Sequence, residues 1–218
     1  MSSAHLSRCR LYAIVDLGYV EPRDALATTK ALIAGGVDLL QLRAKQQSLP
    51  DLANLARELH TLTRDRGVPL IVNDHPEIAR DIGAEGVHVG QDDLAVAEAR
   101  AIVGANCMVG KSTHSLDQAI NAFYEWVDYI GFGPIFATPT KPDYRPTGLE
   151  PVAPVHDAVR IPIFCIGGIK LDNLAKVIEA GAQRVVIVSG LLQADDVAAA
   201  ARAAKQLLNR KLKIENPK

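Results

Sequence analysis

Three polar side chains alternate along one short apolar segment of the sequence. Gln41, Arg43 and Lys45 stand at every second position of QLRAK, so a strand and its extension would place all three on one side. Two cations in a strand that is buried on both faces need anionic partners or a ligand. A planar arginine fork beside a lysine point charge predicts a cradle for a diphosphate. The alternative is a ladder of ion pairs with carboxylates inside the protein.

Carboxylates follow the next two apolar segments. Asn73 and Asp74 end LIVND, and Asp92 and Asp93 come just after GVHVG. Carboxylates at neighbouring strand ends suit Mg²⁺, which takes a few carboxylate oxygens together with water and substrate phosphate oxygens. The pattern therefore predicts a magnesium site. The alternative is that Asp74 and Asp93 each cap a helix, and Pro76 would fit the first turn of such a helix.

Hydroxyl groups and a histidine follow the next apolar segment, at Ser112, Thr113 and His114. No GxSxG motif or sequence partner marks a nucleophile–base triad. His114 is a candidate acid or base, because the ordinary pKa of histidine is close to neutral. The alternative is a helix cap, with Ser115 beginning the next helix.

Two further loops carry groups that suit phosphate. The long segment 134–149 offers Thr138, Thr140 and Lys141, two hydroxyls and a cation that can close over a ligand. Its four prolines also fit a stiff surface loop. Glycines at 167–168 and the Val188–Ser189–Gly190 segment let backbone N–H groups approach an anion closely. The alternative for these glycines is a pair of tight turns.

Short apolar segments and amphipathic helices alternate along the whole chain, and these elements must position the polar residues. Three helical segments end in Gly-Ala before the next strand, which indicates a repeated strand–helix unit. The expected helices include 51–66, 171–180 and 197–208. The expected strands are 11–16, 39–43, 70–74, 86–90, 108–112, 129–133, 163–167 and 185–189.

Eight strand–helix units predict an α/β protein with eight parallel strands closed into a single (β/α)8 (TIM) barrel. Loops after the strands form the sites of such barrels, and the polar residues above stand there. The rival, a doubly wound open sheet, would need a GxGxxG turn that DLGYVEPRD lacks. We expect one domain over residues 1–218, with the barrel over about 11–208 and a solvated tail over 209–218.

Composition narrows the class of protein and of partner. The chain has 218 residues, 48% of them hydrophobic, and a net charge of −1, which excludes a general affinity for nucleic acid or anionic membranes. Cys9, Cys107 and Cys165 show no zinc or pairing pattern, and the first ten residues contain no apolar leader. We expect a cytoplasmic protein that binds small phosphorylated molecules. Self-association into a homo-oligomer is left open.

Several stretches, in this order and spacing, resemble the thiamine-phosphate synthase family over about residues 11–192. The matching pieces are GGVDLLQLRAK, LIVNDHPEIARDIGAEGVHVGQDDL, GKSTH, DYIGFGPIFATPTKPD with GLE further on, and IPIFCIGGIKLDN followed by GAQRVVIVSG. The resemblance implies a (β/α)8 barrel that joins hydroxymethylpyrimidine diphosphate to a thiazole phosphate and releases diphosphate. His75 and Lys111 depart from the residues usual in the family.

The resemblance also implies a role for each matching position. Arg43, Lys45, Ser112 and Lys141 would be catalytic. Asp74 and Asp93 would hold Mg²⁺. The pyrimidine diphosphate would contact Gln41, Arg43, Lys45, Asn73, Ser112 and Lys141, and the thiazole phosphate would contact Thr138, Pro139, Thr140, Gly168, Val188 and Ser189.

The expected chemistry is a dissociative substitution without an enzyme nucleophile. Diphosphate leaves once Mg²⁺, Arg43, Lys45 and Lys141 neutralise its charge. Two alternatives remain. A thiazole tautomerase on a related barrel would use His114 as acid or base and would need neither the diphosphate cradle nor Mg²⁺. A non-catalytic sensor would bind thiazole or thiamine phosphates without turnover.

Overall fold

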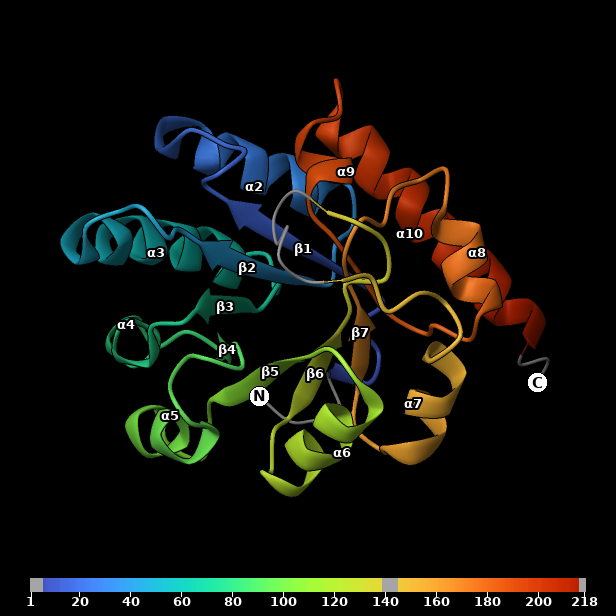
Figure 1. The fold of residues 1–218 in the computed structure, drawn as a ribbon. Coiled ribbons are helices and arrows are strands. Elements are labelled where there is room, and N and C mark those ends of the chain that lie inside the picture. Colours follow the sequence, from blue (N-terminus) through green and yellow to red (C-terminus); the bar gives the residue numbers. More distant parts are fainter. Residues whose placement is uncertain (1–5, 139–144, 216–218) are drawn as a thin grey trace.

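Eight parallel strands form a closed barrel (Figure 1). The computed structural model describes residues 6–138 and 145–215, with side chains described as far as residue 210. The strands follow one another around the barrel in chain order, and β8 pairs with β1 to close it. Helices connect the strands and surround the barrel. The predicted (β/α)8 architecture is confirmed.

The strands are short and the helices vary widely in length. The strands are β1 (Leu11–Asp16), β2 (Leu39–Arg43), β3 (Leu70–Asn73), β4 (Gly86–Val89), β5 (Met108–Thr113), β6 (Tyr129–Phe132), β7 (Ile163–Cys165) and β8 (Val185–Ile187). The helices are η1 (Pro22–Asp24), α2 (Ala25–Ala34), α3 (Leu49–Arg64), α4 (Pro76–Ile82), α5 (Val96–Val103), α6 (Leu116–Tyr124), α7 (Val152–Ala158), α8 (Leu174–Glu179), α9 (Ser189–Leu192) and α10 (Val197–Glu215). No helix among the described residues is long and apolar enough to cross a membrane.

The helix ends differ from the sequence-based expectation for local reasons. Helix α3 begins two residues early because the Ser48 side chain accepts a bond from the Asp51 N–H. Helix α8 begins late because Asn173 uses its side chain to tie the preceding loop, accepting from the Lys170 N–H and donating to the Gly168 carbonyl. Helix α10 continues to Glu215, so most of the expected tail is helical.

Aromatic side chains fill the inside of the barrel. Tyr12, Tyr129 and Phe164 pack edge to face, with ring centroids 5.3 to 6.1 Å apart. Gly110 makes room for them, because a Cβ at this position would lie 2.1 Å from the Tyr129 ring. The interior is therefore a packed core below a polar mouth.

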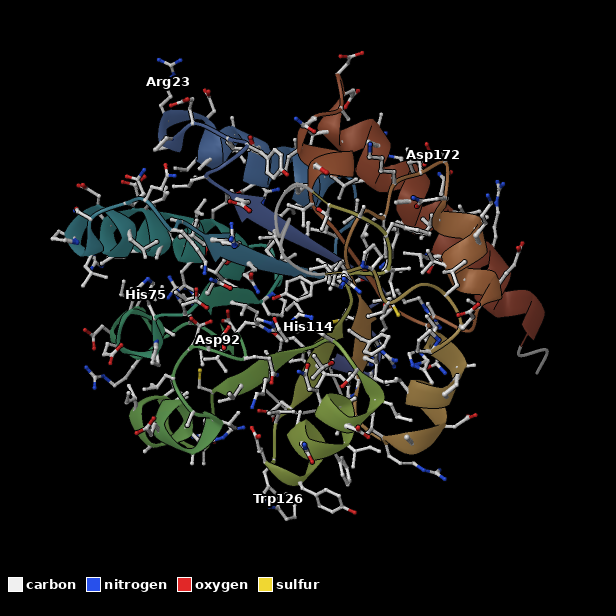
Figure 2. All side chains as sticks on the ribbon, in the orientation of Figure 1. Arg23, His75, Asp92, His114, Trp126 and Asp172 are labelled. Atoms are coloured by element: carbon white, nitrogen blue, oxygen red, sulfur yellow. The ribbon has the colours of Figure 1, made fainter. Side chains whose placement is uncertain are left out.

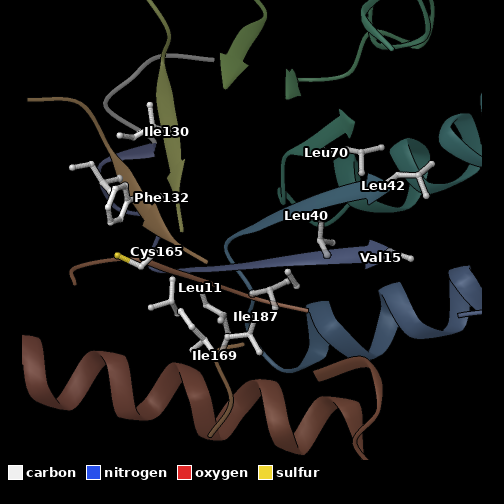
Figure 3. Packing of buried hydrophobic residues seen from close by; sticks show 14 of the residues in the cluster. Leu11, Val15, Leu40, Leu42, Leu70, Ile130, Phe132, Cys165, Ile169 and Ile187 are labelled. Carbon is white, nitrogen blue, oxygen red and sulfur yellow. The ribbon is translucent and has the colours of Figure 1, made fainter. Parts of the chain in front are cut away.

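A second apolar layer lies between the strands and the helices. Figure 3 shows Leu11, Ile169 and Ile187 from this layer, all nearly inaccessible to solvent. Each such side chain stabilises the fold by about 1.5–3 kcal/mol through burial. This packing fixes the strands, and so it fixes the positions of the residues at their ends.

Candidate functional site

The carboxyl ends of the strands surround an open pocket. Eight residues of the predicted site line it, and they come from six different strands or the loops that follow them. These are Gln41, Arg43, Asn73, Ser112, Thr138, Gly168, Val188 and Ser189. Pro139, Thr140 and Lys141 lie outside the described residues. The barrel thus collects segments far apart in the sequence into one mouth.

Arg43 pairs with a carboxylate that the sequence analysis did not single out. Its Nη1 lies 2.7 Å from Oδ2 of Asp16, and the Asp16 side chain is only 3% exposed. Asp16 ends β1 directly beside Arg43 at the end of β2. Its other oxygen accepts a bond from the Gly18 N–H at 2.9 Å. The carboxylate thereby holds the guanidinium at the mouth.

Lys45 also pairs with a carboxylate, and this pair leads to the predicted metal site. Lys45 Nζ lies 3.4 Å from Oδ2 of Asp74. The ion pairs expected under the alternative interpretation of QLRAK are therefore present for both cations. Asp16 and Arg43 line the pocket, whereas Lys45 and Asp74 do not, and the diphosphate role stays a prediction.

Asp74 and Asp93 do not cap helices, so that alternative is wrong. The N-cap of α4 is His75, which makes no side-chain capping bond, and Asp74 has a left-handed backbone with φ 63°. Asp93 precedes the N-cap of α5, Ala95, and its Oδ2 accepts from the Gly90 N–H at 2.7 Å. Both side chains are turned to the loops of the mouth instead.

The two carboxylates are close enough to raise the pKa of one of them. Burial raises the pKa of Asp74, the adjacent Asp93 carboxyl raises it further, and Lys45 opposes both effects. No group of three or more His, Cys, Asp or Glu side chains suited to a metal occurs among the described residues. Two neighbouring carboxylates are compatible with Mg²⁺, which keeps several waters and takes substrate oxygens, and the magnesium site stays a prediction.

A chain of hydrogen bonds crosses the floor of the pocket. Gln41 Nε2 donates to the Tyr12 hydroxyl at 2.6 Å, and the Tyr12 and Tyr129 hydroxyls lie 3.2 Å apart. Tyr129 OH lies 3.2 Å from Nδ1 of His88, whose Nε2 lies 3.0 Å from the Ser112 hydroxyl. Burial raises the pKa of both tyrosines, so both keep their protons.

If the hydrogen bonds all run from Tyr12 toward Ser112, the hydroxyl protons of both tyrosines have an acceptor. Tyr12 then donates to Tyr129, Tyr129 donates to Nδ1 of His88, and His88 donates from Nε2 to the Ser112 oxygen. In this arrangement the proton of the Ser112 hydroxyl is directed away from His88. Ser112 can then donate to an anion in the pocket.

His88 and Tyr129 were missed in the sequence, although a signal existed. His88 alternates with two valines in β4, and a polar residue at an interior position of a strand is the mark of a site. The sequence analysis named His114 as a candidate acid or base. Its Nδ1 lies 2.5 Å from the Gly133 carbonyl, and Figure 2 shows this histidine near the centre of the barrel. Ser115 caps α6 as the alternative interpretation expected.

The opposite side of the pocket is built from glycine-rich backbone. Gly167 and Gly168 both have positive φ, and a Cβ on Gly168 would lie 2.7 Å from the Phe136 side chain. Only glycine allows this loop to pass so close to the loop after β6. Val188 and Ser189 begin the short helix α9 next to it. Gly168, Val188 and Ser189 all line the pocket, so the backbone of this side lies close to it.

Lys111, one of the departures from the usual family pattern, does not line the pocket. Its Nζ lies 2.6 Å from Oε2 of Glu125, just after α6. His75, the other departure, is the N-cap residue of α4 and does not line the pocket either. Neither residue therefore changes the lining of the mouth.

Comparisons with known proteins identify the family. Residues 11–191 match the family described as thiamine monophosphate synthase. The thiamine-phosphate synthase of Chloroflexus aurantiacus is 46% identical over 210 residues, covering 96% of this chain and 97% of that protein. The thiamine-phosphate synthase of Thermus thermophilus is 45% identical over 185 residues, covering 84% and 88%.

A solved structure agrees with this assignment. The thiamine phosphate pyrophosphorylase of Pyrococcus furiosus superposes with a TM-score of 0.87 at 28% identity and covers 95% of this chain and 98% of that one. The sequence match spans almost the whole barrel, and the structural match has the same extent. The chain belongs to the thiamine monophosphate synthase family.

Proposed function

We propose that this chain condenses hydroxymethylpyrimidine diphosphate with a thiazole phosphate to give thiamine phosphate and diphosphate. The observation that carries the proposal is one pocket lined by two groups of residues whose chemistry suits anions. Arg43 and Ser112 line one side, and Gly168 and Ser189 line the other. Two phosphorylated substrates can therefore meet within a single chain, as the membership in the family leads one to expect.

The diphosphate of the pyrimidine substrate would bind along the ends of β2 and β5. Arg43, held by Asp16, offers its remaining N–H groups, and Ser112 offers a hydroxyl oriented by His88. Lys45 reaches the same rim and balances the charge of Asp74. We expect Lys141 to add a further cation. These groups stabilise the negative charge that develops on the departing diphosphate.

Asp74 and Asp93 would hold Mg²⁺ beside the diphosphate. The bound ion would supply a Lewis acid that neutralises phosphate oxygens. The positive charge would favour the ionised form of Asp74, whose pKa is raised by burial and by the adjacent Asp93 carboxyl. Asn73, which precedes Asp74 and lines the pocket, would orient the pyrimidine substrate there.

The reaction needs no nucleophile from the protein. The C–O bond to the pyrimidine methylene breaks, and its electron pair leaves with the diphosphate. The electron-rich aminopyrimidine carries the resulting cation, with Gln41 as a hydrogen-bonding partner for the ring. The thiazole nitrogen then forms the new C–N bond with its lone pair. The protein contributes position and charge stabilisation.

The thiazole phosphate would bind at the glycine-rich side. Backbone N–H groups near Gly168, Val188 and Ser189 would contact its phosphate. Thr138 lines the same pocket, and we expect Pro139 and Thr140 to extend this contact. The phosphate would in this way hold the thiazole nitrogen toward the pyrimidine methylene.

A coupled assay tests the function. Purified protein is mixed with both substrates and Mg²⁺, and thiamine phosphate is followed by thiochrome fluorescence with and without EDTA. We expect product that depends on the metal. Folded protein that binds thiazole phosphate without forming product would favour the tautomerase or the sensor instead.

Substituted substrates test the dissociative step separately. An electron-withdrawing group on the pyrimidine destabilises a methylene cation, so turnover should fall steeply while binding is kept. Equal turnover with the substituted and unsubstituted pyrimidine would exclude a cationic intermediate.

We also propose a cytoplasmic location. Cys107 and Cys165 are buried thiols, and burial raises their pKa to about 11 and about 12. Thiols of this kind are inert and suit a reducing compartment. Cell fractionation with an antibody against the chain tests the location.

A further inference from the structure

The amino ends of the strands, opposite the mouth, carry a repeated hydrogen-bonding arrangement, which we call the carboxylate clasp. A carboxylate just before β2, β4 or β6 accepts a bond from a backbone N–H at the start of the preceding strand. The three bonds are Leu11 N–H to Asp38 at 2.9 Å, Leu70 N–H to Glu85 at 2.8 Å and Val109 N–H to Asp128 at 2.8 Å. Each clasp ties two neighbouring strands together.

Each clasp also includes a side chain that can carry positive charge. Lys205 contacts Asp38, Arg100 contacts Asp128 and His60 Nε2 lies 3.3 Å from Glu85. A carboxylate in this position is therefore paired on both sides. Three of the four pairs formed by an odd strand and the next even strand share this design.

The fourth pair, β7 and β8, has no carboxylate at the matching position. Gly83–Ala84–Glu85 precedes β4, and Gly181–Ala182–Gln183 precedes β8, so Gln183 takes the place of Glu85. The likeness extends further. Proline directly precedes both β3 and β7, and the helix before each of these strands carries a histidine, His60 in α3 and His156 in α7. The two quarters of the barrel are alike at these positions, with Gln183 where the other has Glu85.

Gln183 does not reproduce the clasp. Its side-chain oxygen accepts a bond from Arg184 Nη1 at 3.2 Å, and its backbone N–H donates to His156 Nε2 at 3.3 Å. An open cavity lies here, lined by residues that include His156, Ile163 and Arg184. The cavity stands beside the first residue of β7, where a fourth carboxylate would be.

Two donors at this cavity have no acceptor within the described part of the chain. Because His156 Nε2 accepts a bond, the proton of the neutral ring is on Nδ1, and this nitrogen is buried without a partner. The Nε of Arg184 is also buried without a partner, while its Nη2 donates to the Ser7 carbonyl at 2.8 Å. Buried polar groups normally have partners, so the cavity has an excess of donors.

The charged residues that line the cavity are mainly cationic, so they favour an anion, as the excess of donors does. Arg160 and Arg184 line it together with one acidic residue, Asp157, and Arg10 is near enough to lower the pKa of Arg184 after the larger effect of burial. Burial and the charge of Arg184 lower the pKa of His156, which keeps its ring neutral. The described groups facing the cavity therefore sum to a positive charge.

We propose that this cavity binds a small oxyanion, a phosphate or a carboxylate, which takes the place of the missing fourth carboxylate. The ligand would accept from Arg184 and His156 and would join β7, β8 and α7. Because the site is at the amino end of β7, it is separate from the mouth, where Gly167 and Gly168 follow the other end of the same strand.

Inorganic phosphate is the first probe, and the readout must separate the two ends of the barrel. Backbone amide NMR signals of Ile163 and Gln183 report the cavity, and those of Gly168 and Ser189 report the mouth. We expect both sets to shift with phosphate in the wild-type protein. In Arg184→Gln the first set should respond at least tenfold more weakly while the second is unchanged. Amides of Ile163 and Gln183 that never shift would overturn the proposal.

Gln183→Glu gives a test that does not depend on removing a cation. The new carboxylate can make the clasp seen at Glu85, so we expect a higher Tm and loss of the phosphate response at Ile163. Gln183→Ala is the matched control, because it leaves the cavity without a carboxylate and should keep the response. Equal phosphate binding in Gln183→Glu and wild type would contradict the proposal.

Acetate, titrated in the same way, identifies the class of oxyanion. Tighter binding of phosphate would assign the site to phosphate groups, and tighter binding of acetate would assign it to carboxylates. Absence of a response to both anions at Ile163 and Gln183 would overturn the proposal.

Discussion

The Asp74–Asp93 pair at the mouth of the barrel differs from the carboxylates at the amino ends of the strands. At the amino ends, Asp38 and Asp128 each accept from a backbone N–H and contact a cationic side chain. At the mouth, Asp74 stands beside Asp93, and this neighbour contributes to its raised pKa. Asp38 and Asp128 thus tie strands together, whereas Asp74 has an acidic neighbour that Lys45 only partly balances. Such imbalance is typical of sites that bind a ligand.

The largest effect should come from Asp74→Asn. If Asp74 holds Mg²⁺, its loss should lower kcat/KM for thiamine phosphate formation by about 100-fold or more. Because the substitution also relieves repulsion by Asp93, the Tm should stay equal or rise. Asp92→Asn is the matched control, since Asp92 is exposed on the loop after β4, next to Asp93, and should keep full activity. An equal loss of kcat/KM in both variants would show that Asp74 has no special role in the reaction.

The opposite result is expected from Asp128→Ala at the amino end. The change removes the acceptor of the Val109 N–H and the partner of Arg100, so it should lower the free energy of unfolding by about 1–3 kcal/mol. Activity per folded molecule should be unchanged. Urea denaturation and the coupled assay measure the two quantities. An Asp128→Ala variant with normal stability and low activity would contradict a purely structural role for Asp128.

A smaller effect is expected from Tyr129→Phe, which cuts the hydrogen-bond chain between the packed interior and the mouth. The ring still fills the space beside Gly110, but Tyr12 and His88 lose their shared partner. We expect kcat to fall about fivefold, equivalent to roughly 1 kcal/mol, because Ser112 is less well oriented. Ser112→Ala combined with Tyr129→Phe should cost no more than Ser112→Ala alone. Additive losses would show that Tyr129 does not act through Ser112.

The smallest effect concerns pH and the amino-end cavity. Burial holds the pKa of His156 below its ordinary value of 6.5, so the unfolded chain binds the proton more readily than the folded chain. Stability should therefore fall as the pH falls below about 6.5. His156→Phe should remove part of this dependence when unfolding is measured in phosphate-free buffer. An unchanged slope would show that His156 does not contribute.

The sequence predicted the barrel well because its signal repeats eight times. All eight strands occur where the apolar segments indicated, and their ends differ by at most two residues. Helix ends were harder, because single side chains such as Ser48 and Asn173 decide them. The alternation of Gln41, Arg43 and Lys45 correctly indicated one side of a strand at the mouth, since period-two spacing depends only on backbone geometry.

Contacts between residues of different strands could not be predicted in the same way. Asp16 meets Arg43 because β1 and β2 are in a particular register, and no local pattern states that register. His88 reaches Ser112 from the neighbouring strand, and Tyr129 reaches Tyr12 from across the barrel. The exchange of Glu85 for Gln183 was visible in the sequence, but its meaning required the clasps to be seen in space.

The dependence of the rate on Mg²⁺ tests the central claim most directly. Formation of thiamine phosphate is measured over a range of Mg²⁺ concentrations in the wild-type protein and in Asp74→Asn/Asp93→Asn. We expect a saturating dependence in the wild type and almost no activity at any Mg²⁺ concentration in the double variant. A wild-type rate that does not depend on Mg²⁺, or the same saturation curve in both proteins, would contradict the account of the mouth.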